Sequence, residues 1–282
     1  MAPVLHIMEV KMLVVEIIKS IILGIVEGIT EWLPISSTGH MILVNEFMNS
    51  DTGFFGEQIY LYVIQLGAIL AIATLYFNKL NPFSPSKTSE EKKDTWQMWF
   101  KVIAACVPAA VIGLLFNDAM DKISTPVVVS SMLIIYGIGF LLAERGNKSA
   151  KISKMEAMPY KTAILIGLFQ VLSIVPGTSR SGATILGAIL LGCSRELSAE
   201  FSFFLAIPVM FGVSFLKIIT NDYAMGTEEW MLLLVGMAVA YLVSIIAVKF
   251  LTNYVRKHDF KVFGYYRIIV GILILLYFAI MG

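Results

Sequence analysis

Hydrophobic residues in this chain fall into long stretches that are separated by short polar segments. Six stretches are long enough to cross about 30 Å of hydrocarbon as helices, which rise about 1.5 Å per residue. They cover residues 59–77, 98–116, 126–143, 200–219, 230–251 and 264–281. The pattern therefore predicts an all-α integral membrane protein with six transmembrane helices.

Two further apolar regions, 12–48 and 160–193, are interrupted near their middle by polar residues, glycine and proline. The interruptions read EWLPISSTGH and PGTSRSGAT, and the apolar run from Ile185 to Cys193 spans only about half a membrane. Non-helical backbone survives at membrane depth only where it is buried in protein or lines a polar cavity. Both regions are therefore predicted to be re-entrant helix pairs, which enter and leave on the same side.

Composition supports a single membrane domain over residues 1–282. Hydrophobic residues make up 58% of the 282 and charged residues 15%, against about 45–50% and about 25% in soluble domains. A net charge of +1 leaves no basic surface for nucleic acid. Cys106 and Cys193 both lie in apolar runs, which argues against a disulfide framework or a cysteine metal site. Charged residues within the first apolar region, with no small-residue cleavage site after it, argue against a cleaved signal peptide.

The distribution of basic residues predicts the orientation. Thirteen Lys and Arg residues lie in the segments 78–97, 144–161, 194–199 and 252–263. Only Lys11 and Lys122 lie in the opposite set, which comprises 1–11, 41–58, 117–125 and 220–229. The positive-inside rule makes the first set cytoplasmic and places both termini outside. This partition requires that neither broken region makes a net crossing.

The chain also contains an internal repeat. A shift of 143 positions aligns Gly24–Glu27 with Gly167–Gln170, and it aligns Ser36, Thr38 and Gly39 with Ser179, Ser181 and Gly182. Each half then holds one re-entrant pair and three spans, and an odd number of crossings inverts the second copy. We expect inverted repeats at about 12–143 and 160–282, with a polar site near the midplane where the breaks meet. Chance similarity between Gly- and Leu-rich segments is the alternative.

The first break carries two carboxylates and a hydroxyl cluster. Glu27 and Glu31 share one helix face, where two buried carboxylates repel unless a cation or a proton intervenes. Since Mg²⁺ takes one or two carboxylates plus substrate oxygens, the pair predicts a divalent cation, Mg²⁺ or Ca²⁺. The alternative is a structural pair bonded to the other repeat.

Beyond these carboxylates, Ser36, Ser37, Thr38 and Gly39 offer hydroxyl and N–H donors that would bind an anion. His40 adds a group that titrates near neutrality and could act as acid, base or nucleophile. A histidine that is merely hydrogen-bonded in the core is the simpler alternative.

The second break offers an arginine among small polar residues. Arg180 is the only Lys or Arg in the middle of either break, and its planar guanidinium matches phosphate. A salt bridge from Arg180 to Glu27 or Glu31 is the structural alternative, and it does not exclude phosphate binding. The neighbouring substrate-binding candidates are Thr178, Ser179, Ser181, Gly182 and Thr184.

Four motifs together resemble the bacitracin-resistance family of undecaprenyl-pyrophosphate phosphatases: GIVEGITEWLPISSTGH, the tetrapeptide QLGA at 65–68, PGTSRSGAT, and EFSFFLAIP at 200–208. The resemblance extends over essentially the whole chain. It implies hydrolysis of the C55 polyprenyl diphosphate to the monophosphate and phosphate in the bacterial inner or plasma membrane. That step recycles the lipid carrier for cell-wall synthesis.

In this interpretation Arg180 and the hydroxyls clamp the phosphates, while Glu27 and Glu31 hold the cation or position the nucleophile. Either Ser37 or His40 attacks phosphorus, and direct attack by water stays open. We expect the site to open to the outer face because most catalytic groups lie on the externally inserted pair, although the basic cytoplasmic loops would attract an anion better.

A transporter or flippase for a polyprenyl phosphate is the alternative function, because broken helices in inverted repeats are also a transporter architecture. An intramembrane protease is disfavoured by the lack of HExxH and GxSG motifs. The sequence leaves a homodimer open.

Overall fold

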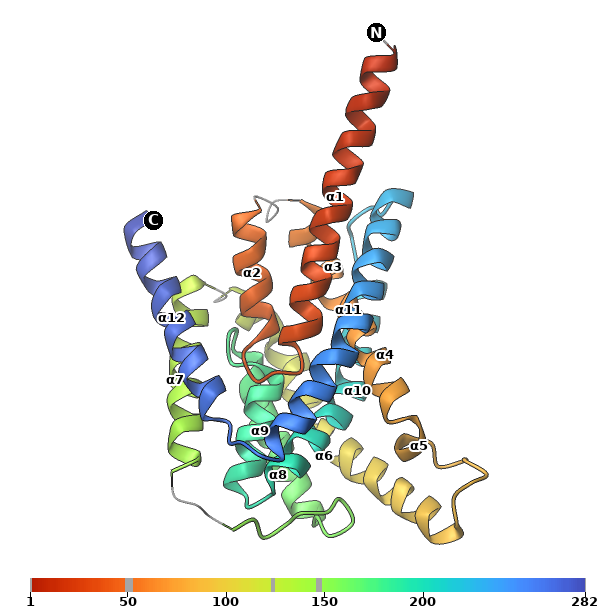
Figure 1. Ribbon diagram of the computed structural model, residues 1–282, viewed down its shortest axis with the longest axis vertical. Helices are drawn as coiled ribbons and strands as arrows, with labels where there is room; N and C mark the ends of the chain where they lie inside the picture. Colours follow the sequence, from red (N-terminus) through yellow and green to blue (C-terminus); the bar gives the residue numbers. More distant parts are fainter. Residues whose placement is uncertain (1, 49–52, 123–124, 146–148, 282) are drawn as a thin grey trace.

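The computed structural model describes residues 2–48, 53–122, 125–145 and 149–281, and helices are its regular elements there (Figure 1). In chain order these are α1 (Ala2–Thr30), α2 (Ser37–Phe47), η1 (Phe54–Gly56), α3 (Gln58–Val63), α4 (Gln65–Leu75), α5 (Phe77–Leu80), α6 (Ser89–Lys122), α7 (Pro126–Ala143), α8 (Tyr160–Val171), η2 (Leu172–Ile174), α9 (Arg180–Leu190), α10 (Arg195–Ile219), α11 (Thr227–Val255) and α12 (Lys261–Met281).

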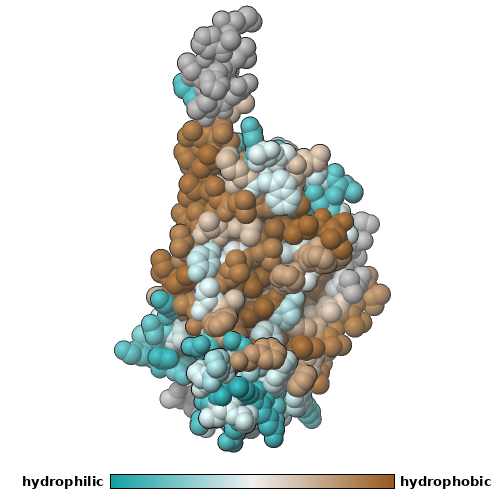
Figure 2. All heavy atoms as spheres, turned by 90° about the vertical axis from the view of Figure 1, so that its right-hand side faces the viewer, coloured by the Kyte–Doolittle hydropathy of each residue, from teal (hydrophilic) through white to brown (hydrophobic). Residues whose placement is uncertain are grey.

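Six segments of the described chain are long and apolar enough to cross a membrane, which confirms the predicted number of spans. They are Gln58–Leu75, Ser89–Gly113, Pro126–Ala143, Arg195–Ile219, Thr227–Val255 and Lys261–Ile280. Each overlaps one predicted stretch. Large apolar side chains such as Leu70 and Ile246 are more than half exposed on these helices, a surface that suits lipid and not water. Figure 2 shows apolar side chains around the middle of the molecule and polar ones gathered at its lower end.

The two broken regions form two helix pairs of similar build. In Figure 1, α1 and α2 lie in the upper half of the molecule and α8 and α9 in the lower half, so the two breaks approach each other near mid-height. Both α2 and α9 contain 11 residues.

The same serine conformation ends both breaks. Ser36 has φ 77° and Ser179 has φ 73°. Residues other than glycine rarely adopt such backbone angles, which cost about 1–3 kcal/mol each. Each serine caps the helix that follows: Ser36 Oγ accepts from Gly39 N at 3.3 Å, and Ser179 Oγ accepts from Gly182 N at 3.0 Å. The two breaks are thus built alike at positions that are 143 residues apart.

Helices of one half pack closely on helices of the other. α1 runs along α11, α8 along α6, and α7 along α12. Glycines permit this approach, because a Cβ at Gly24 would lie 2.6 Å from the carbonyl oxygen of Gly236, and one at Gly167 would lie 2.1 Å from that of Ala105. Small residues of this kind let backbones touch where lipid provides no hydrophobic driving force. This packing fixes the positions of the two breaks relative to each other.

Candidate active site

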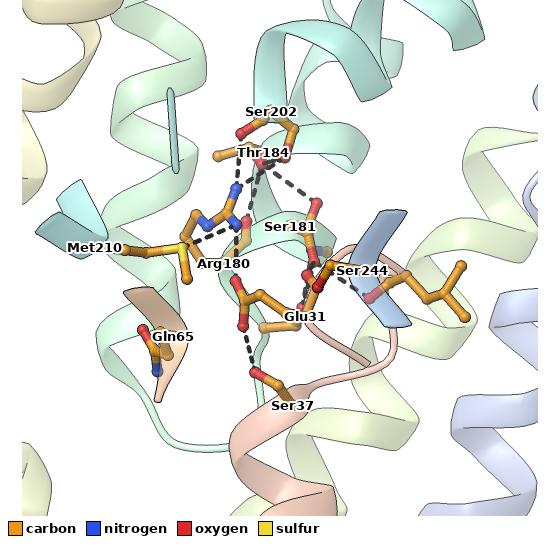
Figure 3. Close-up of polar contacts among 12 residues, drawn as sticks. Glu31, Ser37, Gln65, Arg180, Ser181, Thr184, Ser202, Met210 and Ser244 are labelled. Atoms are coloured by element: carbon orange, nitrogen blue, oxygen red, sulfur yellow. Dashed lines mark hydrogen bonds and ion pairs between the residues drawn. The ribbon is translucent and has the colours of Figure 1, made fainter. Parts of the chain in front are cut away.

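A buried chain of hydrogen bonds joins the two breaks through Glu31. Arg180, the first residue of α9, donates from Nη2 to Glu31 Oε1 at 2.7 Å. Ser37, the first residue of α2, donates from Oγ to Glu31 Oε2 at 2.5 Å. Figure 3 shows the three side chains in line, with the carboxylate between the hydroxyl and the guanidinium. The structure therefore contains the Arg180–Glu31 salt bridge, and it adds Ser37 to it.

Arg180 is held on several sides. Nη1 donates to the Ser202 carbonyl at 2.7 Å, and the guanidinium lies over the Trp32 ring at 5.7 Å. Nη2 also lies 3.5 Å from Met210 Sδ. Nε is buried and has no hydrogen-bond partner among the described residues. One N–H of the guanidinium therefore stays available to a ligand.

Two hydroxyls of α9 make structural bonds beside this chain. Ser181 Oγ donates to the Glu31 carbonyl at 3.0 Å, which ties the first break to the start of α9. Thr184 Oγ1 donates to the Arg180 carbonyl at 2.9 Å and shares a hydrogen bond of 2.7 Å with Ser202. These two residues, predicted to bind substrate, thus hydrogen-bond the backbone carbonyls of Glu31 and Arg180.

Glu27 lies one helical turn before Glu31 and is 1% exposed. It interacts electrostatically with Glu31 and Arg180, but its Oε1 has no hydrogen-bond partner among the described residues. A buried carboxylate oxygen without a partner is costly, so the donor set fits a cation. The described residues hold no group of three or more His, Cys, Asp or Glu side chains around one point.

His40 is engaged away from the Ser37–Glu31–Arg180 chain. Its Nδ1 lies 2.7 Å from the Ser36 carbonyl and its Nε2 lies 2.7 Å from the Tyr266 hydroxyl. The imidazole also stacks on the Tyr266 ring, with centroids 5.7 Å apart. With both ring nitrogens bonded, His40 anchors α2 to α12 in this structure and does not line the cavity beside Ser37.

A cavity of about 240 Å³ opens beside the Ser37–Glu31–Arg180 chain. Six predicted residues line it: Glu31, Ser36, Ser37, Thr38, Ser179 and Arg180. Seven others do not line it: Glu27, Gly39, His40, Thr178, Ser181, Gly182 and Thr184. The wall also contains Gln65 and Gln170, and it becomes apolar at Ala109, Gly113, Val209 and Val213. A polar end of the cavity thus continues into an apolar one.

Two larger hollows, of about 570 and 650 Å³, lie among the connecting loops. Both walls carry both signs of charge, with Lys151 and Glu196 in the first hollow and Lys79 and Glu91 in the second, and neither contains a predicted site residue. The cavity of about 240 Å³ is therefore the one that is lined by Glu31, Ser37 and Arg180.

Comparison with known proteins identifies the family of this chain. The family model described as "Bacitracin resistance protein BacA" matches residues 20–273. The chain belongs to this family. It is 56% identical to a protein of Enterococcus faecalis strain V583 named undecaprenyl-diphosphatase, over 94% of this chain and 99% of that protein. A protein of the same name from Acetivibrio thermocellus is 56% identical over 93% of this chain and 98% of its own length. Undecaprenyl-diphosphatase 1 of Clostridioides difficile is 52% identical, over 94% and 97%.

The buried Arg267 of α12, absent from the predicted site, clamps both breaks in this BacA family member. It is 0% exposed and donates to five carbonyl oxygens. Three of them belong to the breaks: Pro34 at 3.0 Å, Gly177 at 3.0 Å and Thr178 at 2.9 Å. Its guanidinium also lies over the Tyr136 ring at 5.5 Å. An arginine within an apolar span was the available signal, because such residues are rare and face the protein interior.

We expect Arg267→Met to destabilise the protein, because the carbonyls of Pro34, Gly177 and Thr178 would lose a buried donor at about 1–3 kcal/mol each. A net loss of about 3 kcal/mol would lower the unfolding midpoint by roughly 6–12 °C. The measurement is thermal unfolding of the purified protein in detergent. Arg256→Met is the control, since Arg256 is exposed and lies 3.9 Å from Glu196. Equal midpoints for the two variants would contradict the clamp.

Proposed function

We propose that this chain is an undecaprenyl-diphosphatase that uses Ser37 as its nucleophile. The reaction converts undecaprenyl diphosphate into undecaprenyl phosphate and inorganic phosphate, recycles the lipid carrier for cell-wall synthesis and confers bacitracin resistance. The observation that carries the proposal is the Ser37–Glu31–Arg180 chain on the wall of a cavity between membrane-spanning helices. A nucleophile bonded to a base that a third group orients is the arrangement expected for covalent catalysis.

In the first step Ser37 Oγ attacks the terminal phosphorus and its proton passes to Glu31. The bond from this phosphorus to the bridging oxygen breaks, and undecaprenyl phosphate leaves with the electron pair. In the second step water attacks the phosphoserine and the Oγ–P bond breaks. One water proton stays on the released phosphate, and the other returns to Ser37 Oγ through Glu31, which first releases its earlier proton to solvent.

Arg180 neutralises the charge that develops on the phosphoryl oxygens. Its Nε has no partner among the described residues, and its Nη2 is bonded to Glu31, so a diphosphate in the cavity meets a donor that is already oriented. Preoriented donors in a site of low dielectric need no rearrangement as the transition state forms. Phosphoryl transfer depends chiefly on such positioning and charge neutralisation.

Phosphate release from a prenyl diphosphate tests this assignment, and a flippase would release none. We expect Ser37→Ala to abolish turnover. Arg180→Lys should lower the rate roughly ten- to a hundredfold, since losing a charge-assisted contact costs about 1.5–3 kcal/mol. Arg256→Lys, at an exposed arginine, should match the parent. If Ser37→Ala releases phosphate at the parent rate, Ser37 is not the nucleophile. If Arg180→Lys does so, Arg180 does not bind the phosphates.

We further propose that Glu27 holds a divalent cation, Mg²⁺ or Ca²⁺, together with the substrate phosphates. Its unpartnered buried oxygen supports this role, whereas both oxygens of Glu31 are already bonded. When bound, the cation would offset the negative charge of the diphosphate.

Glu27→Gln should therefore raise the cation concentration needed for half-maximal activity or abolish turnover, and a chelator should inhibit the parent. The measurement is a Mg²⁺ titration of phosphate release after chelation. Glu196→Gln, at an exposed helix start, should leave the titration unchanged. A Glu27→Gln titration that superposes on the parent would make this carboxylate purely structural.

The arrangement of the helices supports the topology inferred from charge. The loops that precede α6, α8, α10 and α12 all lie toward the lower end in Figure 1, and the start of α1 and the end of α12 lie toward the upper end. We propose that the lower end is cytoplasmic, that α1–α2 and α8/η2–α9 are re-entrant, and that they begin two inverted repeats at about 12–143 and 160–282. Both termini and the opening of the site would then face the outside of the cell membrane.

Sidedness can be tested by cysteine labelling in a background with Cys106→Ser and Cys193→Ser. Thr38 suits the probe because it lines the cavity and is exposed, whereas Ser36 is 1% exposed. An impermeant thiol reagent should modify Thr38→Cys in intact spheroplasts, and vanadate should protect it. Ser153→Cys, in the loop before α8, should react only in inverted vesicles. The reverse pattern would place the site on the cytoplasmic face.

A further inference from the structure

Gln170 is a buried polar side chain that the mechanism above does not use. It lies near the end of α8, just before the second break, and is 1% exposed. Neither Oε1 nor Nε2 has a hydrogen-bond partner among the described residues. The side chain nevertheless lines the same cavity as Glu31, Ser37 and Arg180.

Leaving both ends of a buried carboxamide unpaired is unfavourable, at about 1–3 kcal/mol for each group. Gln65 on the same cavity wall differs, because its Nε2 lies 3.4 Å from the Leu61 carbonyl. The fold therefore leaves the amide N–H groups and the carbonyl oxygen of Gln170 for a ligand to bind.

The chemistry of the carboxamide restricts that ligand. Nε2 donates, so it suits a phosphate oxygen, but Oε1 only accepts and needs a donor, which among the reactants is the O–H of water. A fully ionised phosphate oxygen offers no proton. Phosphate and water together satisfy both ends, and they are the reactants that meet when a phosphoserine is hydrolysed.

We propose that Gln170 contacts the substrate, with Nε2 donating to an oxygen of the terminal phosphoryl group and Oε1 accepting from the water that hydrolyses phosphoserine 37. This role rests on the proposed diphosphatase activity. In the second step Gln170 neither gains nor loses a proton, and it orients water toward phosphorus opposite the Oγ–P bond that breaks. A glutamine positions the attacking water in some nucleotide hydrolases in the same way.

The internal repeat gives a physical reason for the amide. Gln170 stands where the 143-residue shift places Glu27. A second carboxylate at that position would repel the diphosphate, whereas an amide of the same length can donate to it without adding negative charge.

Binding of a prenyl methylenediphosphonate, whose P–C–P bridge resists hydrolysis, tests the contact independently of turnover. We expect Gln170→Met to bind farnesyl methylenediphosphonate about tenfold more weakly than the parent in detergent, and Gln170→Glu to bind it more weakly still. The control is Gln97→Met, in the part of α6 that lies away from the cavity. Equal affinity for Gln170→Met and the parent would overturn the proposal.

Thermal unfolding separates this role from a structural one. Since Gln170 makes no side-chain hydrogen bond with the described residues, Gln170→Met should unfold at or above the parent midpoint without ligand. A lower midpoint with a matching loss of affinity would assign Gln170 to the fold and overturn the proposal.

The hydrolysis step has its own signature. With substrate that carries ³²P in its terminal phosphate, Gln170→Met should release phosphate ten- to a hundredfold more slowly and retain more label on Ser37 than the parent. Labelling and release that fall in equal proportion would overturn the role in water attack. If the parent binds the diphosphonate in a Gln170-dependent way but releases no phosphate, the diphosphatase proposal fails while the contact stands.

Discussion

The ion pair between Arg180 and Glu31 is the interaction on which the rest of this site depends. It joins two chain breaks inside a membrane protein, where neither an arginine nor a carboxylate is stable alone. A buried ion pair is maintained only when further hydrogen bonds satisfy its remaining atoms. Ser37 and Ser202 do this here for every atom except Nε of Arg180, and the hydroxyl that hydrogen-bonds Glu31 is also the proposed nucleophile. Structural stabilisation and activation of the serine are therefore one arrangement.

The backbone of the breaks poses a second constraint, which Arg267 meets. Where a helix stops inside the hydrocarbon layer, its carbonyl groups lose their partners and water is not available to replace them. Arg267 donates to carbonyls of both breaks, at Pro34 and at Gly177 and Thr178. Arg267 thus stabilises the backbone of both breaks, while Arg180 lines the cavity. The two arginines differ in their partners, because Arg267 donates to backbone carbonyls whereas Arg180 also pairs with the carboxylate of Glu31.

The cavity places a polar wall beside an apolar one. Its polar wall carries Ser37 and Arg180, and its apolar wall on α6 and α10 passes through Gly113 and Val209. Gly113 has open space where a side chain would lie. A headgroup and the first part of a polyprenyl chain can therefore occupy continuous surfaces of matching polarity, and burial of the isoprenoid carbons would contribute binding energy remote from the reacting phosphorus.

Much of the architecture was determined by the sequence itself. Hydrocarbon thickness sets the length of a spanning helix, so the six spans could be predicted from apolar runs alone. The breaks and their charged residues could also be recognised from the sequence, because polar residues are costly within apolar membrane segments. The pairing of Glu31 with Arg180 could be named only as one of two options, since a four-residue spacing places both glutamates on the same helix face.

Only the tertiary structure decided which side chains meet. His40 and Ser37 are three residues apart in the sequence, yet α2 directs one to Tyr266 on α12 and the other to Glu31. The sequence offered a signal for Arg267, an arginine within an apolar span, and for Gln170, the repeat counterpart of Glu27. It did not record their surroundings, because these come from helices distant in the chain. Periodicity and hydropathy report how each segment meets the solvent, whereas the partner of a buried polar atom depends on how separate segments are packed.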